Sequence, residues 1–426
     1  MVLPATDPDE PVAGAPASSL TAAQLADYHR DGFVVLKGAI GEADVSRYEA
    51  GFARNPPRDD RLAEGSPQWP EPGRFTLARN CLKDPDLAPL AEHPSIIPAV
   101  TDVLGAEPLL TAFVIYDRTP GGPGIPSHND YKRWRPVGSS MNWAFTIVPF
   151  CDFDAETGRL FVAPGSHQPE RVHEGSERPL EVTPPAKPDE ASYVDAGLER
   201  GDLLLMNMHL WHRADGNRSD RHRVGAFNKY AAADAPPATG YLLYDQDVHE
   251  ALSPAGRRLL AVHSDKPLAT TRLVLMRDRG EPEFLFADGD SDDDSGHGER
   301  PGRLSLPGGP TWTEEAIPDW DDGNYIAALQ GWLRDRLRIE TPWVSYVGDF
   351  DEGDHLCRVY AYTLPGFGFP RPWDGYRWLR RDQVASSMDD LVFGWELDAI
   401  DRWLDPAVIR GKGVTQTQAR VNQYAY

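Results

Sequence analysis

The chain has 426 residues and a hydrophobic content of 40%, which predicts about two to three domains with packed cores. Its formal net charge of −23 argues against nucleic acid or an anionic membrane as a partner, because phosphate groups bind basic surfaces. The three cysteines are odd in number and widely spaced, so they indicate neither a disulfide framework nor a zinc knuckle, and we expect a cytoplasmic protein.

The first segment, residues 1–19, is rich in Pro and Ala without periodicity and predicts a mobile tail. It lacks the cationic start and apolar run of a secretory signal, and no window of the chain approaches the ~20 apolar residues that cross a bilayer. Thr21 and Gln24 can form a capping box at the start of the helix TAAQLADYHRDG. A buried strand, FVVLKGA, and two helices, GEADVSRYEAGFARN and HPSIIPAVTDVLG, are predicted to follow.

Short apolar runs separated by Gly, Pro and Asp extend from PLLTAFVIYDR to HRVGAFNKYAA. This rhythm is typical of a β-sandwich or jelly roll. We therefore predict a jelly-roll domain over residues 20–240, a polar helical linker over 241–265 and a second, mixed α/β domain over 266–426.

Candidate metal ligands stand in the segment GIPSHNDYKRWRP, where His128 and Asp130 are two apart and share one face of a strand. A third ligand has to come from a distant strand, and His209 and His212 are the candidates. Because they are three apart, a strand points them to opposite faces, so only one can join the pair. Two imidazoles and one carboxylate suit non-haem Fe(II) that activates dioxygen, although zinc tolerates similar donors.

The span from about Leu20 to Ala233 resembles the phytanoyl-CoA dioxygenase family of Fe(II)/2-oxoglutarate oxygenases. Four motifs carry this resemblance in the order of the family: the opening LTAAQLADYHRDGFVVLKG, the His-x-Asp segment HND, the segment TGRLFVAPGSH, and a distal run from Gly201 through His212, Asn217, Ser219 and Arg223. The resemblance implies an α+β chain whose first domain is a double-stranded β-helix, or jelly roll.

The resemblance also implies the site. Fe(II) would be held by His128, Asp130 and His212, so that His209 is a packed or hydrogen-bonded residue. Arg223 would pair with the distal carboxylate of the cosubstrate 2-oxoglutarate, which a planar guanidinium matches with two hydrogen bonds. Arg221 is the second choice for this role. With O2 as the oxidant, the implied reaction is the oxidation of a C–H bond in a small molecule, in the biosynthesis of a secondary metabolite.

Two positions refine the expected reaction. Related halogenases carry Gly or Ala where this chain has Asp130, so the resemblance implies hydroxylation or another oxidation and not halogenation. Ala214 stands where family members often carry a hydroxyl residue that helps to hold the cosubstrate, which is a departure from the pattern. Family members act on acyl-CoA esters, amino acids, terpenoids and nucleosides, and the same fold with an inert site is the alternative.

A basic, aromatic turn follows the first two ligands directly. Lys132, Arg133 and Trp134 could hold an anionic or planar polar substrate, and we predict that they bind it. The alternative is a solvated loop whose cations pair with the many carboxylates of the chain.

The second domain contains LSLPGGPTWTEEAIPDWDDGNYIAALQGWLRDRLRI, which resembles the box of Nudix hydrolases, with Gly309 followed by Glu315. Trp332 and Arg336 occupy positions where that family carries Glu, and only Asp335 is acidic. Magnesium-assisted attack on a diphosphate needs several carboxylates on one helical face. We therefore predict a non-hydrolytic, Nudix-like scaffold for contacts, homodimer formation or pocket closure. A regulatory protein with a Nudix-like sensor and a diphosphate hydrolase are the alternatives.

An acidic run, DGDSDDD, covers residues 288–294. Its spacing allows a calcium loop, but Asp293 stands where such a loop needs Gly. A solvated loop is therefore the prediction.

Overall fold

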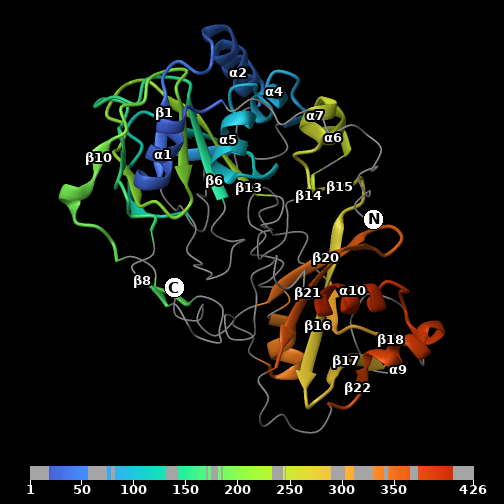
Figure 1. Ribbon diagram of the computed structural model, residues 1–426. Helices are drawn as coiled ribbons and strands as arrows, with labels where there is room; N and C mark the ends of the chain where they lie inside the picture. The colour runs from blue at the N-terminus through green and yellow to red at the C-terminus, as the bar shows by residue number, and fades with distance from the viewer. Residues whose placement is uncertain are drawn as a thin grey trace. The chain divides into compact units, whose positions relative to one another are not determined.

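The computed structural model describes most of the chain in two compact units (Figure 1). The N-terminal unit comprises Pro11–Ala235 and Leu242–His263, and the C-terminal unit contains Ser264–Tyr426. The residues described are 19–55, 74–77, 82–130, 143–168, 171–173, 181–183, 186–232, 243–244, 246–288, 303–310, 329, 331–339, 344–364 and 373–405.

The N-terminal unit begins with the predicted helix. The Thr21 hydroxyl accepts a hydrogen bond from the Gln24 backbone at 3.2 Å, and the Gln24 side chain accepts one from the Thr21 backbone at 2.8 Å, which confirms the capping box. A glycine in the left-handed conformation, Gly105, ends the helix predicted in HPSIIPAVTDVLG, as expected. The helices described before the sheets are α1 (Ala22–Asp31), α2 (Glu42–Arg54), α4 (Ala88–Ala91) and α5 (Ile97–Leu104).

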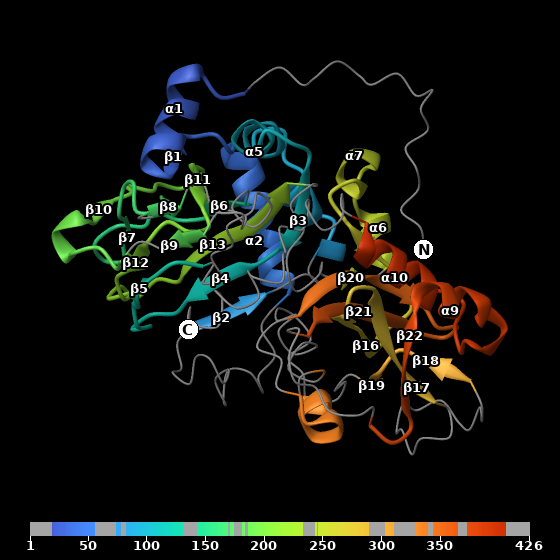
Figure 2. The same cartoon turned by 60° about the horizontal axis from the view of Figure 1, so that its bottom comes forward.

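Two antiparallel sheets form the body of the unit (Figure 2). The larger sheet has the order β1-β11-β6-β13-β4-β2, with β3 also paired to β13, and the smaller has the order β10-β7-β12-β5. The large-sheet strands are β1 (Phe33–Leu36), β2 (Arg74–Leu77), β3 (Pro108–Ala112), β4 (Ile115–Arg118), β6 (Trp143–Pro149), β11 (Leu203–Asn207) and β13 (Arg223–Ala232). The small-sheet strands are β5 (Ile125–His128), β7 (Leu160–Val162), β10 (Val194–Asp195) and β12 (His212–Ala214). A hairpin, β8 (Arg171–His173) with β9 (Glu181–Thr183), and a 3₁₀ turn, Glu190–Ser192, lie outside these sheets.

Side-chain alternation along the strands builds two cores. Leu203 and Leu205 of β11 pack with the helices, whereas Leu204 and Met206 pack in a second cluster that includes Val162 of the small sheet. The large sheet thus has helices on one face and the small sheet on the other. This is the α+β, two-sheet arrangement that the sequence predicts.

The segment predicted as a linker, 241–265, contributes to the N-terminal core. Tyr244, Val248 and Leu252 are buried in the same cluster as the helices, and the backbone N–H of Leu110 donates to the carbonyl of Leu259 at 2.7 Å. The unit therefore extends to His263, while the other predicted domain limits stay predictions. The elements of this segment are β14 (Leu243–Tyr244), α6 (Gln246–Ala251), α7 (Pro254–Arg257) and β15 (Val262–His263).

The C-terminal unit has a mixed sheet of the order β18-β17-β16-β21-β20, in which β16 and β21 are parallel. β19 pairs with β16, and β22 pairs with β17. Its strands are β16 (Leu268–Asp278), β17 (Pro282–Asp288), β18 (Leu304–Ser305), β19 (Gly308–Pro310), β20 (Ser345–Asp351), β21 (Leu356–Thr363) and β22 (Tyr376–Arg380), and its helices are α9 (Arg381–Ser386), the 3₁₀ turn Met388–Asp390 and α10 (Glu396–Leu404). The four strands predicted here, TTRLVLMRD, EFLFADG, WVSYVGDF and CRVYAYTL, correspond to β16, β17, β20 and β21.

The helix predicted at the Nudix-like box is described at Leu329 and over 331–339, where a π-helix spans Leu333–Leu337. Leu333 and Leu337 are buried against the sheet, while Asp335 is exposed and pairs with its neighbour Arg334. Glu315 and residues 289–294 of the acidic run lie outside the described residues. The Nudix-like character of the unit stays a prediction.

Membrane-spanning helices and the pairing of the cysteines are the remaining features of the described residues. No helix among them is long and apolar enough to cross a membrane. Cys151 and Cys357 are both free, and Cys81 lies outside the described part.

Candidate functional site

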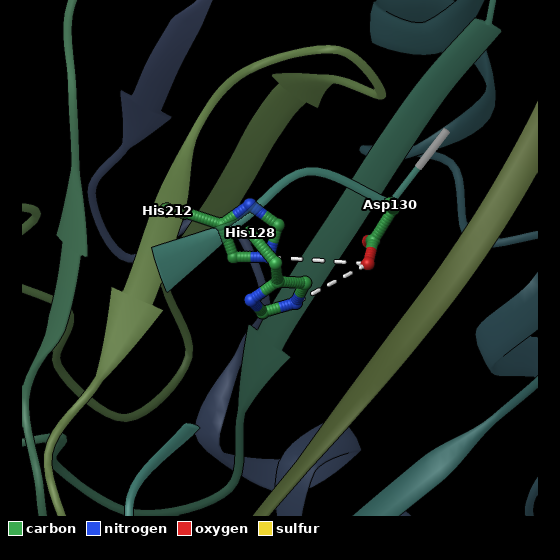
Figure 3. A group of neighbouring side chains, drawn as sticks. All are labelled: His128, Asp130 and His212. Carbon is green, nitrogen blue, oxygen red and sulfur yellow. Dashed lines mark ion pairs between the residues drawn. The ribbon is translucent and has the colours of Figure 1, made fainter. Parts of the chain in front are cut away.

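The structure brings His128, Asp130 and His212 together, whereas His209 is not part of this group (Figure 3). β5 and β12 are antiparallel neighbours, and His128 and His212 are direct partners across the pair. Asp130 follows two residues after the end of β5. One potential ligand atom from each side chain lies within 4.8 Å of the other two.

The three donor atoms face one another. Oδ1 of Asp130 lies 3.5 Å from Nε2 of His128 and 4.0 Å from Nε2 of His212. Two donors bound at right angles to one metal ion, each at about 2.1 Å, are about 3 Å apart. Small side-chain movements would therefore let all three bind the same ion.

The tautomers of the two histidines can be assigned from the backbone. Nδ1 of His128 lies 2.8 Å from the carbonyl oxygen of Pro126, and Nδ1 of His212 lies 3.0 Å from that of Leu210. A carbonyl only accepts, so each Nδ1 carries the proton and each Nε2 presents a lone pair. Two nitrogen lone pairs and a carboxylate oxygen that face one another repel unless a cation lies between them. The residues thus fit a metal ion.

The protonation states also suit a metal. Burial by itself raises the pKa of Asp130, but the nearby Lys229 ammonium opposes it most strongly, and this pKa lies well below its usual range. Burial, and after it the neighbouring His128, lower the pKa of His212 to about 4. At neutral pH the carboxylate is therefore charged and the His212 imidazole is neutral, which are the forms that bind metals.

Arg223 is a buried cation at the start of β13. Its side chain lies over the ring of Phe153, with Cζ 3.5 Å from the ring centroid, and the residue is only 3% exposed. Its Nε and Nη2 have no hydrogen-bond partner among the described residues. Burial, and after it the neighbouring Arg118, lower its pKa. A buried guanidinium without a carboxylate is costly, so the site fits an anion such as the distal carboxylate of 2-oxoglutarate.

Alternation along β13 places Arg223 on the inner face of the large sheet. Ala226 and Tyr230 pack with the helices, whereas Phe227 packs in the core between the sheets. Arg223, Phe227 and Lys229 are an even number of positions apart and share the inner face. Since Lys229 reaches Asp130, the buried guanidinium and the three donor atoms belong to the same interior.

The other motif residues hold the turn between His212 and Arg223. The buried Asn217 side chain donates to the carbonyl oxygens of Arg118 at 3.0 Å and Arg221 at 2.6 Å. The Ser219 hydroxyl in turn donates to the Asn217 side-chain oxygen at 2.7 Å. These bonds fix the chain where it enters β13, which gives this part of the motif a structural reason.

The remaining candidates lie elsewhere. His209 is fully buried outside the group of donors, and Arg221 is a surface residue whose side chain is 58% exposed and pairs with Asp154 at 3.3 Å. The three substrate candidates Lys132, Arg133 and Trp134 lie outside the described residues.

Sequence reasoning missed Lys229, whose Nζ lies 3.8 Å from Oδ2 of Asp130. A signal was present, because HRVGAFNKYAA places this lysine in phase with Arg223 on the face of a strand that is otherwise apolar. A cation at such a position indicates a buried anion.

Part of the chain matches a known protein family. Residues 28–225 match the family described as Phytanoyl-CoA dioxygenase (PhyH). This segment contains both ligand motifs and Arg223. The triad, Arg223 and the family match together support a non-haem iron, 2-oxoglutarate-dependent oxygenase as the class of the N-terminal unit.

Similar proteins include two kinds of dioxygenase. The chain is 28% identical over 147 residues to dioxygenase andF of Emericella variicolor, covering 33% of this chain and 47% of that protein. It is 27% identical over 162 residues to ectoine dioxygenase of Bordetella parapertussis, covering 36% of this chain and 51% of that protein. The chain thus spans about half the length of these curated relatives.

Solved structures with some likeness include EctD from S. alaskensis with 2-oxoglutarate and 5-hydroxyectoine, at a TM-score of 0.41 and 20% identity, covering 52% of this chain and 79% of that one. A second is the non-heme alpha ketoglutarate dependent carbocyclase SnoK from nogalamycin biosynthesis, at a TM-score of 0.40 and 21% identity, covering 52% and 89%.

Proposed function

We propose that this protein is an Fe(II)/2-oxoglutarate-dependent dioxygenase that hydroxylates or otherwise oxidises a C–H bond of a small metabolite. The observation that carries the proposal is the convergence of three unprotonated donor atoms, from His128, Asp130 and His212, in an interior that also holds the unpaired guanidinium of Arg223. The first feature suits a ferrous ion, and the second suits a dicarboxylate.

Bound Fe(II) with 2-oxoglutarate and O2 would supply the oxidising chemistry, in which the keto acid is converted to succinate and CO2. The residues of this chain have four tasks. His128 and His212 present Nε2 because their Nδ1 protons are held by backbone carbonyls. Asp130 adds a negative charge, and Arg223 anchors the far end of the cosubstrate. The burial of His212 limits the access of water from its side of the site.

The test uses the purified full-length protein. Under anaerobic conditions, we expect Fe(II) and 2-oxoglutarate together to produce a metal-to-ligand charge-transfer absorption. With oxygen, we expect slow succinate formation without substrate and faster formation with it. A wild-type protein that neither binds the pair nor forms succinate would contradict the proposal and favour an inert fold.

For the substrate, we propose a small anionic metabolite of secondary metabolism. The support is the basic turn with Lys132, Arg133 and Trp134, which follows Asp130 in the sequence. We expect charge reversal by Lys132→Glu and Arg133→Glu to raise the KM for an anionic substrate about tenfold or more, since each lost charged hydrogen bond is worth about 1.5–3 kcal/mol.

The measurement is substrate-stimulated succinate formation with a panel of small carboxylates and phosphates. The rate without substrate is the internal control, because it reports the iron site alone. An unchanged KM in the reversed variants would remove the basic turn from substrate binding and leave the iron site in place.

We propose that the C-terminal unit is a Nudix-like scaffold that does not hydrolyse diphosphates and that it mediates contacts such as homodimer formation. The support is the composition of its box, in which Trp332 and Arg336 stand where carboxylates are needed. Release of phosphate from a nucleoside diphosphate with Mg²⁺ would favour the hydrolase alternative instead.

A further inference from the structure

Lys229 of β13 lies at the edge of the group of donors. Its ammonium is 3.8 Å from Oδ2 of Asp130, and it lies 5.3 Å from the ring centroid of Phe145, the residue opposite it on β6. The side chain is 24% exposed. Most of the side chain is therefore covered by protein, and its charged end reaches the carboxylate.

The two oxygens of Asp130 have different neighbours. Oδ1 faces Nε2 of His128 and of His212, whereas Oδ2 faces the Lys229 ammonium. A carboxylate that binds a metal through one oxygen commonly has its second oxygen held by another group. The geometry thus separates a metal-facing oxygen from a lysine-facing one.

We propose that Lys229 is a positioning residue, which holds Oδ2 of Asp130 so that the carboxylate binds the metal through Oδ1 alone. This inference rests on the proposed function. A carboxylate that turned to bind through both oxygens would occupy one more position on the metal. With Lys229 in place, three positions stay open, enough for the two donor atoms of 2-oxoglutarate and for O2, whereas a carboxylate bound through both oxygens would crowd the cosubstrate and leave no position for O2.

Charge and geometry act in opposite directions here, which makes the inference testable. A cation close to Asp130 withdraws negative charge from the carboxylate and repels a metal ion, so by charge alone Lys229 weakens metal binding. The benefit of Lys229 lies in the orientation that it gives to the Asp130 carboxylate. Removing it should therefore leave the metal affinity unchanged or tighter, while the affinity for 2-oxoglutarate falls. A variant that is merely damaged would lose both.

The experiment compares full-length Lys229→Met and Lys229→Arg with Lys187→Met, which removes the same charge from an exposed position of the same unit. Co(II) or Mn(II) replaces Fe(II), and calorimetry measures first the metal and then 2-oxoglutarate. We expect Lys229→Met to keep the metal Kd and to raise the 2-oxoglutarate Kd about tenfold. We expect Lys229→Arg to restore much of the affinity and Lys187→Met to behave as wild type.

The d–d absorption of the Co(II) protein gives a second readout, because its intensity depends on the coordination number. We expect it to change in Lys229→Met and not in Lys187→Met. Equal 2-oxoglutarate affinities in Lys229→Met and wild type, or a parallel loss of metal and cosubstrate, would overturn the positioning role alone. A wild-type protein that binds neither ligand would overturn the proposed function and this inference together.

Discussion

Replacing His212 with alanine is expected to abolish 2-oxoglutarate turnover, because the site loses one of its three donors. Four-ligand zinc sites bind their ion with about 10–16 kcal/mol, which is about 3 kcal/mol for each ligand. At about 1.4 kcal/mol for each factor of ten, the metal Kd should rise by roughly a hundredfold or more. His212 is buried beside His128, so water can enter the vacated space without restoring the nitrogen donor.

The control is His209→Gln, three residues earlier in the chain. His209 is fully buried but lies outside the group of donors, so this variant should bind the metal like wild type as long as it folds. Calorimetry with Co(II) measures the metal affinity, and circular dichroism reports folding. A folded His209→Gln protein that loses the metal, beside a His212→Ala protein that keeps it, would reverse the assignment of the third ligand.

Local features of the fold were predictable from the sequence. The capping box of Thr21 and Gln24 depends on residues three positions apart, and both hydrogen bonds are present. His128 and Asp130 could likewise be predicted as a pair, because they are only two positions apart in the sequence. The choice between His209 and His212 was different, because it depends on the strand register. The residue spacing alone did not decide between the two histidines. The order of the family's motifs selects His212, which lies in the group of donors.

The partner of Lys229 was out of reach of local reasoning because it follows a strand of another sheet. Asp130 follows a strand of the small sheet, while Lys229 belongs to the large sheet. Which inner-face residue of one sheet meets which residue of the other is set by how the two sheets face each other, and sequence spacing does not contain that information. The alternation of β13 could predict that Lys229 points inward, but it could not identify the carboxylate.

The extent of the N-terminal unit was misjudged for another reason. The segment 241–265 is polar on average, and average polarity suggested a linker. Its apolar residues Tyr244, Val248 and Leu252 are all buried in the core, although only Val248 lies in a helix, α6, and Tyr244 belongs to β14. A few buried apolar residues, and not the average polarity of the segment, therefore attach it to the N-terminal core.

Replacing Arg223 with methionine is expected to weaken 2-oxoglutarate binding and yet leave the apo protein as stable or more stable. Two charged hydrogen bonds to a carboxylate are worth about 3–6 kcal/mol, so the 2-oxoglutarate Kd should rise by roughly a hundredfold or more. In the apo protein the same guanidinium is buried with Nε and Nη2 unpaired, at a desolvation cost of several kcal/mol. Its contact with the Phe153 ring offsets only about 2 kcal/mol of that cost.

Thermal unfolding with and without 2-oxoglutarate separates the two effects. At a ligand concentration of 100 times its Kd, the cosubstrate stabilises the metal-loaded wild type by about 2.7 kcal/mol, whereas a variant with a hundredfold higher Kd would gain only about 0.4 kcal/mol. Arg221→Met is the matched control, because this exposed arginine pairs with Asp154 on the surface. If Arg221→Met lost the ligand-induced stabilisation and Arg223→Met kept it, the cosubstrate anchor would be the residue ranked second. A fall in apo stability of Arg223→Met would instead show that the buried guanidinium has an anionic partner in the protein itself.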